Sequence, residues 1–229
     1  MINTRSLVIS IFLAVFFVPL IYAQDLSKYR EFQLGMDLLA VAKQAGVDPS
    51  EAKVIYQRPA VIQELEWWTP ISSSSLPQAD PVKEILFSFY NGALYRIVVN
   101  YDKDRTSGLS DEDLIESISA KYGTPTMPAA KIISSSSSQF YNDSEKVIAR
   151  WEDSEYSLNL FRFSYKSSPG MLIYSKRLDA LAQVAIVEAI RLNAQEAPQR
   201  EIEQQNKQDE ERRAAEKEAR PASKANFRP

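Results

Sequence analysis

The residues best suited to chemistry lie in one short segment, where Glu64 and Glu66 alternate with Leu65 and Trp67 and a second tryptophan, Trp68, follows. Alternate side chains of a β-strand share one face, so we expect the two carboxylates to point the same way. Paired carboxylates can hydrolyse glycosides, with an indole as a platform for the sugar. That reaction requires carboxyl groups facing each other across a cleft, which neighbouring positions of one strand do not offer. An exposed indole that binds sugar or peptide is therefore favoured over catalysis, and the alternative is an amphipathic strand with acids in water and a tryptophan packed inward.

Two residue types are missing, because the 229 residues contain no cysteine and no histidine. Ser-His-Asp and Cys-His catalysis are thereby excluded, together with disulfides, lipid attachment to a cysteine and the commonest zinc ligands. The acids around Asp102 and Asp113 do not match a calcium loop, since the sixth position counted from Asp102 is Ser107 rather than glycine. We therefore expect no catalytic residues, no cofactor and no metal site.

Residues 1–23 have the pattern of a secretory signal peptide. Arg5 precedes an apolar run from Leu7 to Ala23 that contains Pro19, and the small Ala23 comes just before polar Gln24. We expect cleavage near Ala23 and export to the periplasm or the exterior, with no stable membrane span afterwards; the alternative is an uncleaved anchor helix. Removal of Arg5 leaves 26 basic against 30 acidic residues, a net charge of −4, which makes nucleic acid an unsuitable partner.

The first part of the exported chain predicts a helix followed by antiparallel strands. Asp37 and Gly46 are typical caps for a helix over 38–45, and Asp48-Pro49-Ser50-Glu51 predicts a short second helical start. Extended segments are expected at 53–57 and 61–68. Asn91-Gly92 predicts a tight hairpin between 82–90 and 93–101. The expected core side of that hairpin comprises Ile85, Phe87, Phe89, Leu94 and Val98.

The plan then recurs. A helix is expected from Ser110 to Gly123, followed by extended segments at 131–134, 146–152, 156–165 and 171–175. Two helix-plus-hairpin repeats, about 30–109 and 110–175, predict an α+β domain over 24–197 with its helices packed on one face of an antiparallel sheet.

The C-terminal part changes character after residue 175. A docking helix is expected over 176–197, ended or kinked by Pro198. The residues assigned to its docking side are Leu178, Leu181, Val184, Ala185, Ile190 and Leu192. Residues 198–229 form a polar, charged tail, expected to be partly helical or disordered, and no apolar heptads support a coiled coil. The complete fold is thus expected to end in a long polar helix.

Two motifs carry a family resemblance. Leu34-Gly35-Met36 before the helix that ends at Gly46, and the hairpin with Phe87 and Phe89 before Asn91-Gly92, resemble the β-lactamase-inhibitor-like group. That group includes the SmpA/OmlA-type outer-membrane assembly lipoproteins, and the resemblance covers about residues 30–175. It implies helices on one face of an antiparallel sheet and a binding role. The chain lacks the lipidation cysteine, and the second helix of each repeat is short or missing, so no contact residues are carried over.

The sequence therefore predicts an exported, non-enzymatic binding or interaction protein of the cell envelope. The possible binding surface comprises Glu64, Glu66, Trp67 and Trp68. The expected partner is another envelope or extracellular protein. Two alternatives stay open: a structural envelope component tethered through its C-terminal arm, and a histidine-free carboxylate hydrolase.

Overall fold

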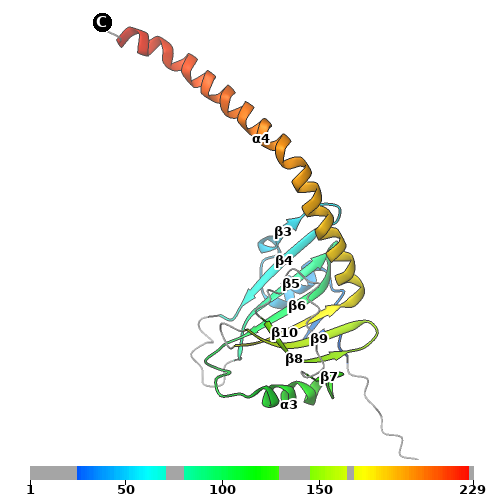
Figure 1. The fold of residues 1–229 in the computed structure, drawn as a ribbon. Helices are drawn as coiled ribbons and strands as arrows, with labels where there is room; N and C mark the ends of the chain where they lie inside the picture. Colours follow the sequence, from blue (N-terminus) through cyan, green and yellow to red (C-terminus); the bar gives the residue numbers. More distant parts are fainter. Residues whose placement is uncertain (1–24, 71–79, 129–144, 164–167, 227–229) are drawn as a thin grey trace, which may run out of the picture.

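An eight-stranded antiparallel sheet forms the centre of the molecule (Figure 1). The computed structural model describes residues 25–70, 80–128, 145–163 and 168–226. The strand order is β3-β4-β5-β6-β10-β9-β8-β7, and the predicted α+β class is confirmed. The strands are β3 Lys53–Tyr56, β4 Ile62–Trp68, β5 Val82–Tyr90, β6 Ala93–Tyr101, β7 Met127–Pro128, β8 Glu145–Glu152, β9 Tyr156–Phe163 and β10 Pro169–Ser175. The strand expected at 131–134 lies outside the described residues.

From each edge of the sheet to its centre, four strands follow one another in chain order, and the two central strands, β6 and β10, run antiparallel. Strands β3 to β6 form one half of the sheet and β7 to β10 the other, and each half follows a helix in the chain. This order corresponds to an approximate two-fold axis perpendicular to the sheet between β6 and β10. Such an axis keeps the two helices on the same side of the sheet.

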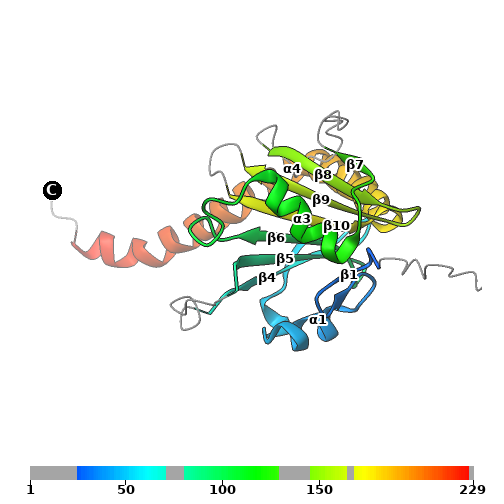
Figure 2. The ribbon, with the colours of Figure 1, turned by 90° about the horizontal axis from the view of Figure 1, so that it is seen from below.

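Both of these helices begin and end at the expected caps. α1 spans Leu38–Ala45, with the Asp37 carboxylate accepting a hydrogen bond from the backbone N–H of Ala40 at 2.8 Å and Gly46 at a φ of 68°. The 3₁₀ helix η1, Pro49–Glu51, follows it. α3 spans Asp111–Tyr122 after a capping box between Ser110 and Asp113. Apolar residues of α1 and α3 join one core on the same face of the sheet, here called the inner face (Figure 2).

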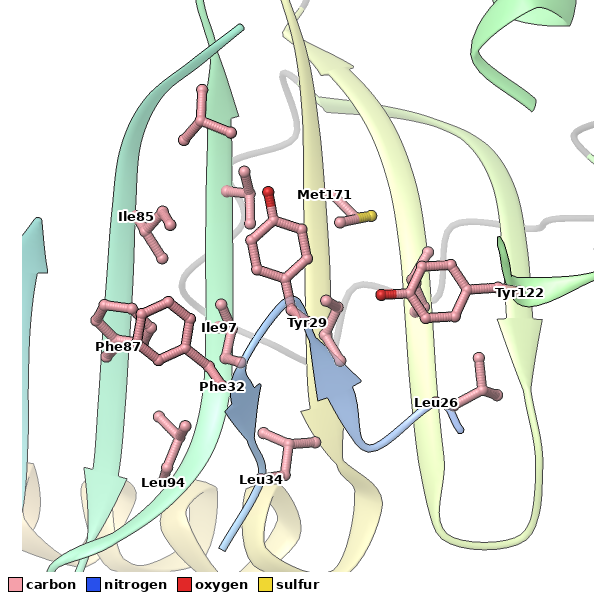
Figure 3. Close-up of a cluster of buried hydrophobic side chains, with 14 of the residues drawn as sticks. Leu26, Tyr29, Phe32, Leu34, Ile85, Phe87, Leu94, Ile97, Tyr122 and Met171 are labelled. Carbon is pink, nitrogen blue, oxygen red and sulfur yellow. The ribbon is translucent and has the colours of Figure 1, made fainter. Parts of the chain in front are cut away.

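A small hairpin at the beginning of the described chain also covers the inner face. It consists of β1, Lys28–Tyr29, and β2, Phe32–Gln33, and the sequence analysis did not predict it. Figure 3 shows Tyr29 and Phe32 against the central strands, and the Phe32 ring centre lies 4.6 Å from that of Phe87. The Tyr122 hydroxyl donates a hydrogen bond to the carbonyl of Lys28 at 2.7 Å. The hairpin therefore ties the N-terminal segment to α3 and the sheet.

The β5–β6 hairpin has the predicted bounds, and of the five residues predicted on its core side only Val98 lies elsewhere. Asn91 and Gly92 both have positive φ, as a tight turn requires. Phe89 lies opposite Leu94, whereas Ser88 lies opposite Arg96, so a bulge at Tyr95 shifts the register. The assignment of Val98 to the core side was therefore wrong. Ile97 and Val99 face the main core instead.

The last helix packs on the opposite, outer face. α4 is a single helix from Lys176 to Asn226, and Pro198 does not end it, contrary to one of the two expectations for that proline. Its first turns pack on the first half of the sheet, where Ala182 and Ile186 meet Ile62 and Tyr95. The ion pair of Glu196 with Arg58 is the last contact along α4 between the helix and the body, among the residues that the structure describes. We call Gln199–Asn226 the arm, and Figure 1 shows it projecting away from the sheet.

Candidate binding surface

Of the four residues singled out on β4, three point to the outer face of the sheet and one, Trp67, points to the inner face. Paired positions across the sheet place Glu66 and Leu86 in one row, which continues on β6 and β10 with Val98 and Leu172. The row ends with Asn159 and Arg150 on β9 and β8. The outer face therefore carries an apolar centre between an acidic end on β4 and a basic end on β8.

Glu64 and Glu66 lie on the same face, as the alternation predicts, but their surroundings differ. The Lys53 ammonium lies 2.7 Å from a carboxylate oxygen of Glu66 and lowers the pKa of that carboxyl. Burial raises the pKa of Glu64, the neighbouring Glu66 adds to the effect, and Arg96 partly offsets it. The two carboxylates stand side by side on one strand, so they do not have the facing arrangement that glycoside hydrolysis requires.

The two tryptophans lie on opposite faces of the sheet. Trp68 is 51% exposed on the outer face, where it pairs with Glu84 across the strands. Trp67 is half-buried on the inner face and packs against the main core. Only Trp68 can therefore join Glu64 and Glu66 in a surface, and Trp67 follows the alternative of an inward-packed tryptophan. Within the described residues, no three acidic side chains are grouped as metal ligands would be.

A buried ion pair that the sequence analysis missed fastens α4 to the outer face. The Arg96 Nε lies 3.0 Å from a carboxylate oxygen of Asp179, and the two side chains are 5% and 15% exposed. The Arg96 guanidinium also lies over the Tyr95 ring. The bulge at Tyr95 turns both residues toward α4, and no sequence pattern signals that bulge. This pair thus holds the first turn of α4 beside Glu64.

The largest group of exposed apolar side chains lies on the side of α4 that faces solvent. We call it the stripe, and it consists of Leu181, Val184, Val187 and Ile190. Val184 is 71% exposed and Val187 59%. The assignment of Leu181, Val184 and Ile190 to the docking side was therefore wrong. The buried side of the helix is formed mainly by small residues and comprises Ala182, Ala185, Ile186 and Ala189.

A surface pocket lies at the start of α4. It measures about 390 Å³ and is formed where the turn between β8 and β9 meets the start of α4. Glu155, Tyr156 and Arg177 contribute to its wall. Glu64, Glu66, Trp67 and Trp68 are not among its lining residues. In the part of the chain that the structure describes, no helix has both the length and the apolar character needed to cross a membrane.

Comparison with known proteins returned no match to a protein family, a curated protein or a solved structure.

Proposed function

We propose that this protein is an exported, non-enzymatic binding protein of the cell envelope and that the stripe on α4 receives its partner. The partner is another envelope or extracellular protein. One observation carries the proposal: four large apolar side chains within ten residues of one helix are exposed to water. Contiguous exposed apolar groups mark interaction sites in folded proteins.

The energetics favour an apolar partner for the stripe. Complete burial of a Val, Leu or Ile side chain contributes about 1.5–3 kcal/mol relative to exposure. The side of α4 that faces the sheet is already packed through its alanines and Ile186. The fold therefore does not require large apolar residues on the side of α4 that faces solvent. An apolar surface on the partner protein would bury the two valines first, since they are the most exposed members of the stripe.

Export rests on the pattern of residues 1–23, and one feature of the fold is compatible with it. Leu26 is buried in the main core, so a mature chain must retain it. Cleavage after Ala23 would do so. The mass of the mature protein tests this step, and a chain in the membrane fraction that still begins with Met1 would contradict it.

Site-specific crosslinking tests the stripe. A photoreactive amino acid at Val184 should give a defined adduct with one envelope protein, whereas the same group at Leu39 should not. Leu39 is a matched control because it is 66% exposed on α1, on the other side of the sheet. The variant Val184→Glu/Val187→Glu should keep its circular dichroism spectrum and lose the partner. Equal capture from both positions would count against the stripe.

An activity screen addresses the enzymatic alternative. Turnover that disappears in Glu64→Gln or Glu66→Gln would overturn a purely binding role.

A second function, a structural component tethered through the arm, is favoured by a different observation. The arm is helical, and the last contact of α4 with the described body, the ion pair of Glu196, comes before the arm begins. A chain truncated after Pro198 should therefore fold normally and lose its localisation or association. If truncation changes neither, the tether is refuted.

A further inference from the structure

The exposed tryptophan at the end of β4 is held in place by its neighbours. Trp68 is the last residue of β4 and is 51% exposed. Its indole N–H, the one donor of this side chain, donates a hydrogen bond to the carboxylate of Glu66 and helps to lower the pKa of that carboxyl. The Lys53 ammonium binds the same carboxylate at 2.7 Å. The indole is therefore fixed in orientation while about half of the residue stays in water.

A second carboxylate lies beside the indole. Glu84 is directly opposite Trp68 on β5, on the outer face of the sheet. The Cβ atoms of opposite residues are about 5 Å apart, so a group that lies against the indole is within reach of the Glu84 carboxylate. The side-chain amide of Asn100 donates a hydrogen bond to one oxygen of that carboxylate at 3.1 Å. Among the described residues, Glu84 forms no ion pair.

The groups left for a ligand at this place accept hydrogen bonds or attract positive charge. The nearby donors are engaged, since Trp68 and Lys53 both bind Glu66, and Asn100 binds Glu84. There remain the face of the indole, which is the negative side of the ring quadrupole, and the carboxylate oxygens. Two carboxylates and one lysine leave a net charge of −1. A sugar, whose hydroxyls both donate and accept, matches this set less well than a cation with several N–H donors.

We propose that Trp68 and Glu84 bind a guanidinium group, presented as an arginine side chain by another protein. A guanidinium is planar and stacks on an aromatic face, and its fork of N–H donors fits a carboxylate. A cation within about 6 Å of an indole ring centre is attracted by the ring itself. A lysine ammonium has neither the plane nor the fork, so we expect it to bind more weakly.

This arginine site is separate from the stripe. α4 packs on Ile62, the first residue of β4, whereas Trp68 is the last. Six steps along a strand amount to about 20 Å. Failure of the arginine site would therefore leave the proposal for the stripe standing, and the reverse also holds.

A titration followed by nuclear magnetic resonance tests the site in the full exported chain, with the Trp68 indole N–H as the reporter. N-acetyl-arginine amide should shift this signal until it saturates, and N-acetyl-lysine amide should bind several-fold more weakly. N-acetyl-citrulline amide, the neutral analogue of the arginine probe, should leave the signal in place. Equal shifts with the citrulline probe would overturn the proposal. A shift with methyl glucoside in place of arginine, or no shift with any probe, would overturn it as well.

Variants assign the binding to the two residues. Glu84→Gln should weaken binding of the arginine probe about two- to fivefold, the range expected for the loss of an exposed ion pair. Glu116→Gln is the matched control, because it removes the same charge from an exposed position of α3 and should change nothing. Trp68→Leu should abolish binding, followed at the backbone N–H of Glu84, while circular dichroism shows an intact fold. Equal binding by Glu84→Gln and the control, or retained binding by Trp68→Leu, would refute the site.

Discussion

The two halves of the sheet share a plan but differ in how they bury an equivalent tryptophan. Trp67 and Trp151 are each the second-last residue of the second strand of their half, and both face the main core. Trp151 is 1% exposed, and its indole N–H donates to the carbonyl of Gly123 at 2.6 Å. Trp67 is only half-buried. The second half therefore locks its helix end to its strand, whereas the first half leaves this position partly open.

On the outer face, it is the first half of the sheet that is covered by a helix. α4 emerges from β10 of the second half but packs on Ile62 and Tyr95 of the first half. In the second half, the Phe161 side chain is buried on that face beside Gly170 instead. The shared plan of the two halves thus acquires distinct surfaces because one helix, placed after the second half, packs its apolar side on the first half. The sites available for binding follow from this asymmetry and not from the repeat.

The largest effect should come from Trp151→Ala. It removes a fully buried indole and leaves the carbonyl of Gly123 without its donor, so we expect a loss of about 3–5 kcal/mol in the free energy of unfolding. Trp67→Ala, at the equivalent position, should cost clearly less, and the exposed Trp68→Ala least of the three. Urea denaturation measures all three variants. Equal losses at Trp151 and Trp67 would abolish the distinction between the halves.

Asp179→Ala should be the next most damaging change. It leaves the Arg96 guanidinium buried beneath α4 without its carboxylate, which typically costs about 3 kcal/mol. Glu188→Ala is the matched control, since Glu188 pairs with Arg191 on the same helix but at its exposed side, and no change is expected there. Arg96→Met/Asp179→Leu should recover most of the loss. Unfolding curves that show no difference between Asp179→Ala and the control would mean that the pair does not hold α4.

Gly170→Ala examines the outer face where α4 is absent. A Cβ at this position would collide with the far edge of the Phe161 ring, and the ring is fully buried. Overpacking of this kind costs about 1–3 kcal/mol. Phe161→Leu in the same chain should remove part of that cost by making room. If the double variant is no better than the sum of its single changes, then the ring does not lie over the glycine.

Local signals were sufficient for much of the fold. Alternating apolar residues and Asn91-Gly92 set the bounds of the long hairpin, and side-chain caps set the ends of α1 and α3. Strands of two residues have no periodicity, so β1 and β2 gave no signal. Val98 was misplaced because a bulge reverses the alternation without leaving a mark in the sequence.

The binding surface was less predictable for a related reason. Alternation correctly put Glu64 and Glu66 on one face and also separates Trp67 from Trp68. On α4, however, the large apolar residues were wrongly assigned to the side that packs on the sheet. Close packing of the helix on the sheet selects alanines such as Ala182, whereas hydrophobicity alone directs larger residues such as Val184 inward. The ion pair of Arg96 and Asp179 joins residues 83 positions apart, and no local pattern could show it.

The smallest effect, a difference in pH dependence, separates two neighbouring carboxylates of the first half. Burial raises the pKa of Glu64, so the folded chain binds this proton more tightly than the unfolded chain does. The stability contributed by Glu64 is then present at low pH and is lost as the pH rises through the raised value. Lys53 lowers the pKa of Glu66, and its contribution is present at neutral pH and lost as the pH falls. Between pH 4 and 7, Glu64→Gln should therefore gain stability relative to the native chain as the pH rises, and Glu66→Gln should lose it. Urea denaturation at several pH values measures both slopes, and slopes of the same sign would show that α4 and Arg96 do not enclose Glu64 on the outer face.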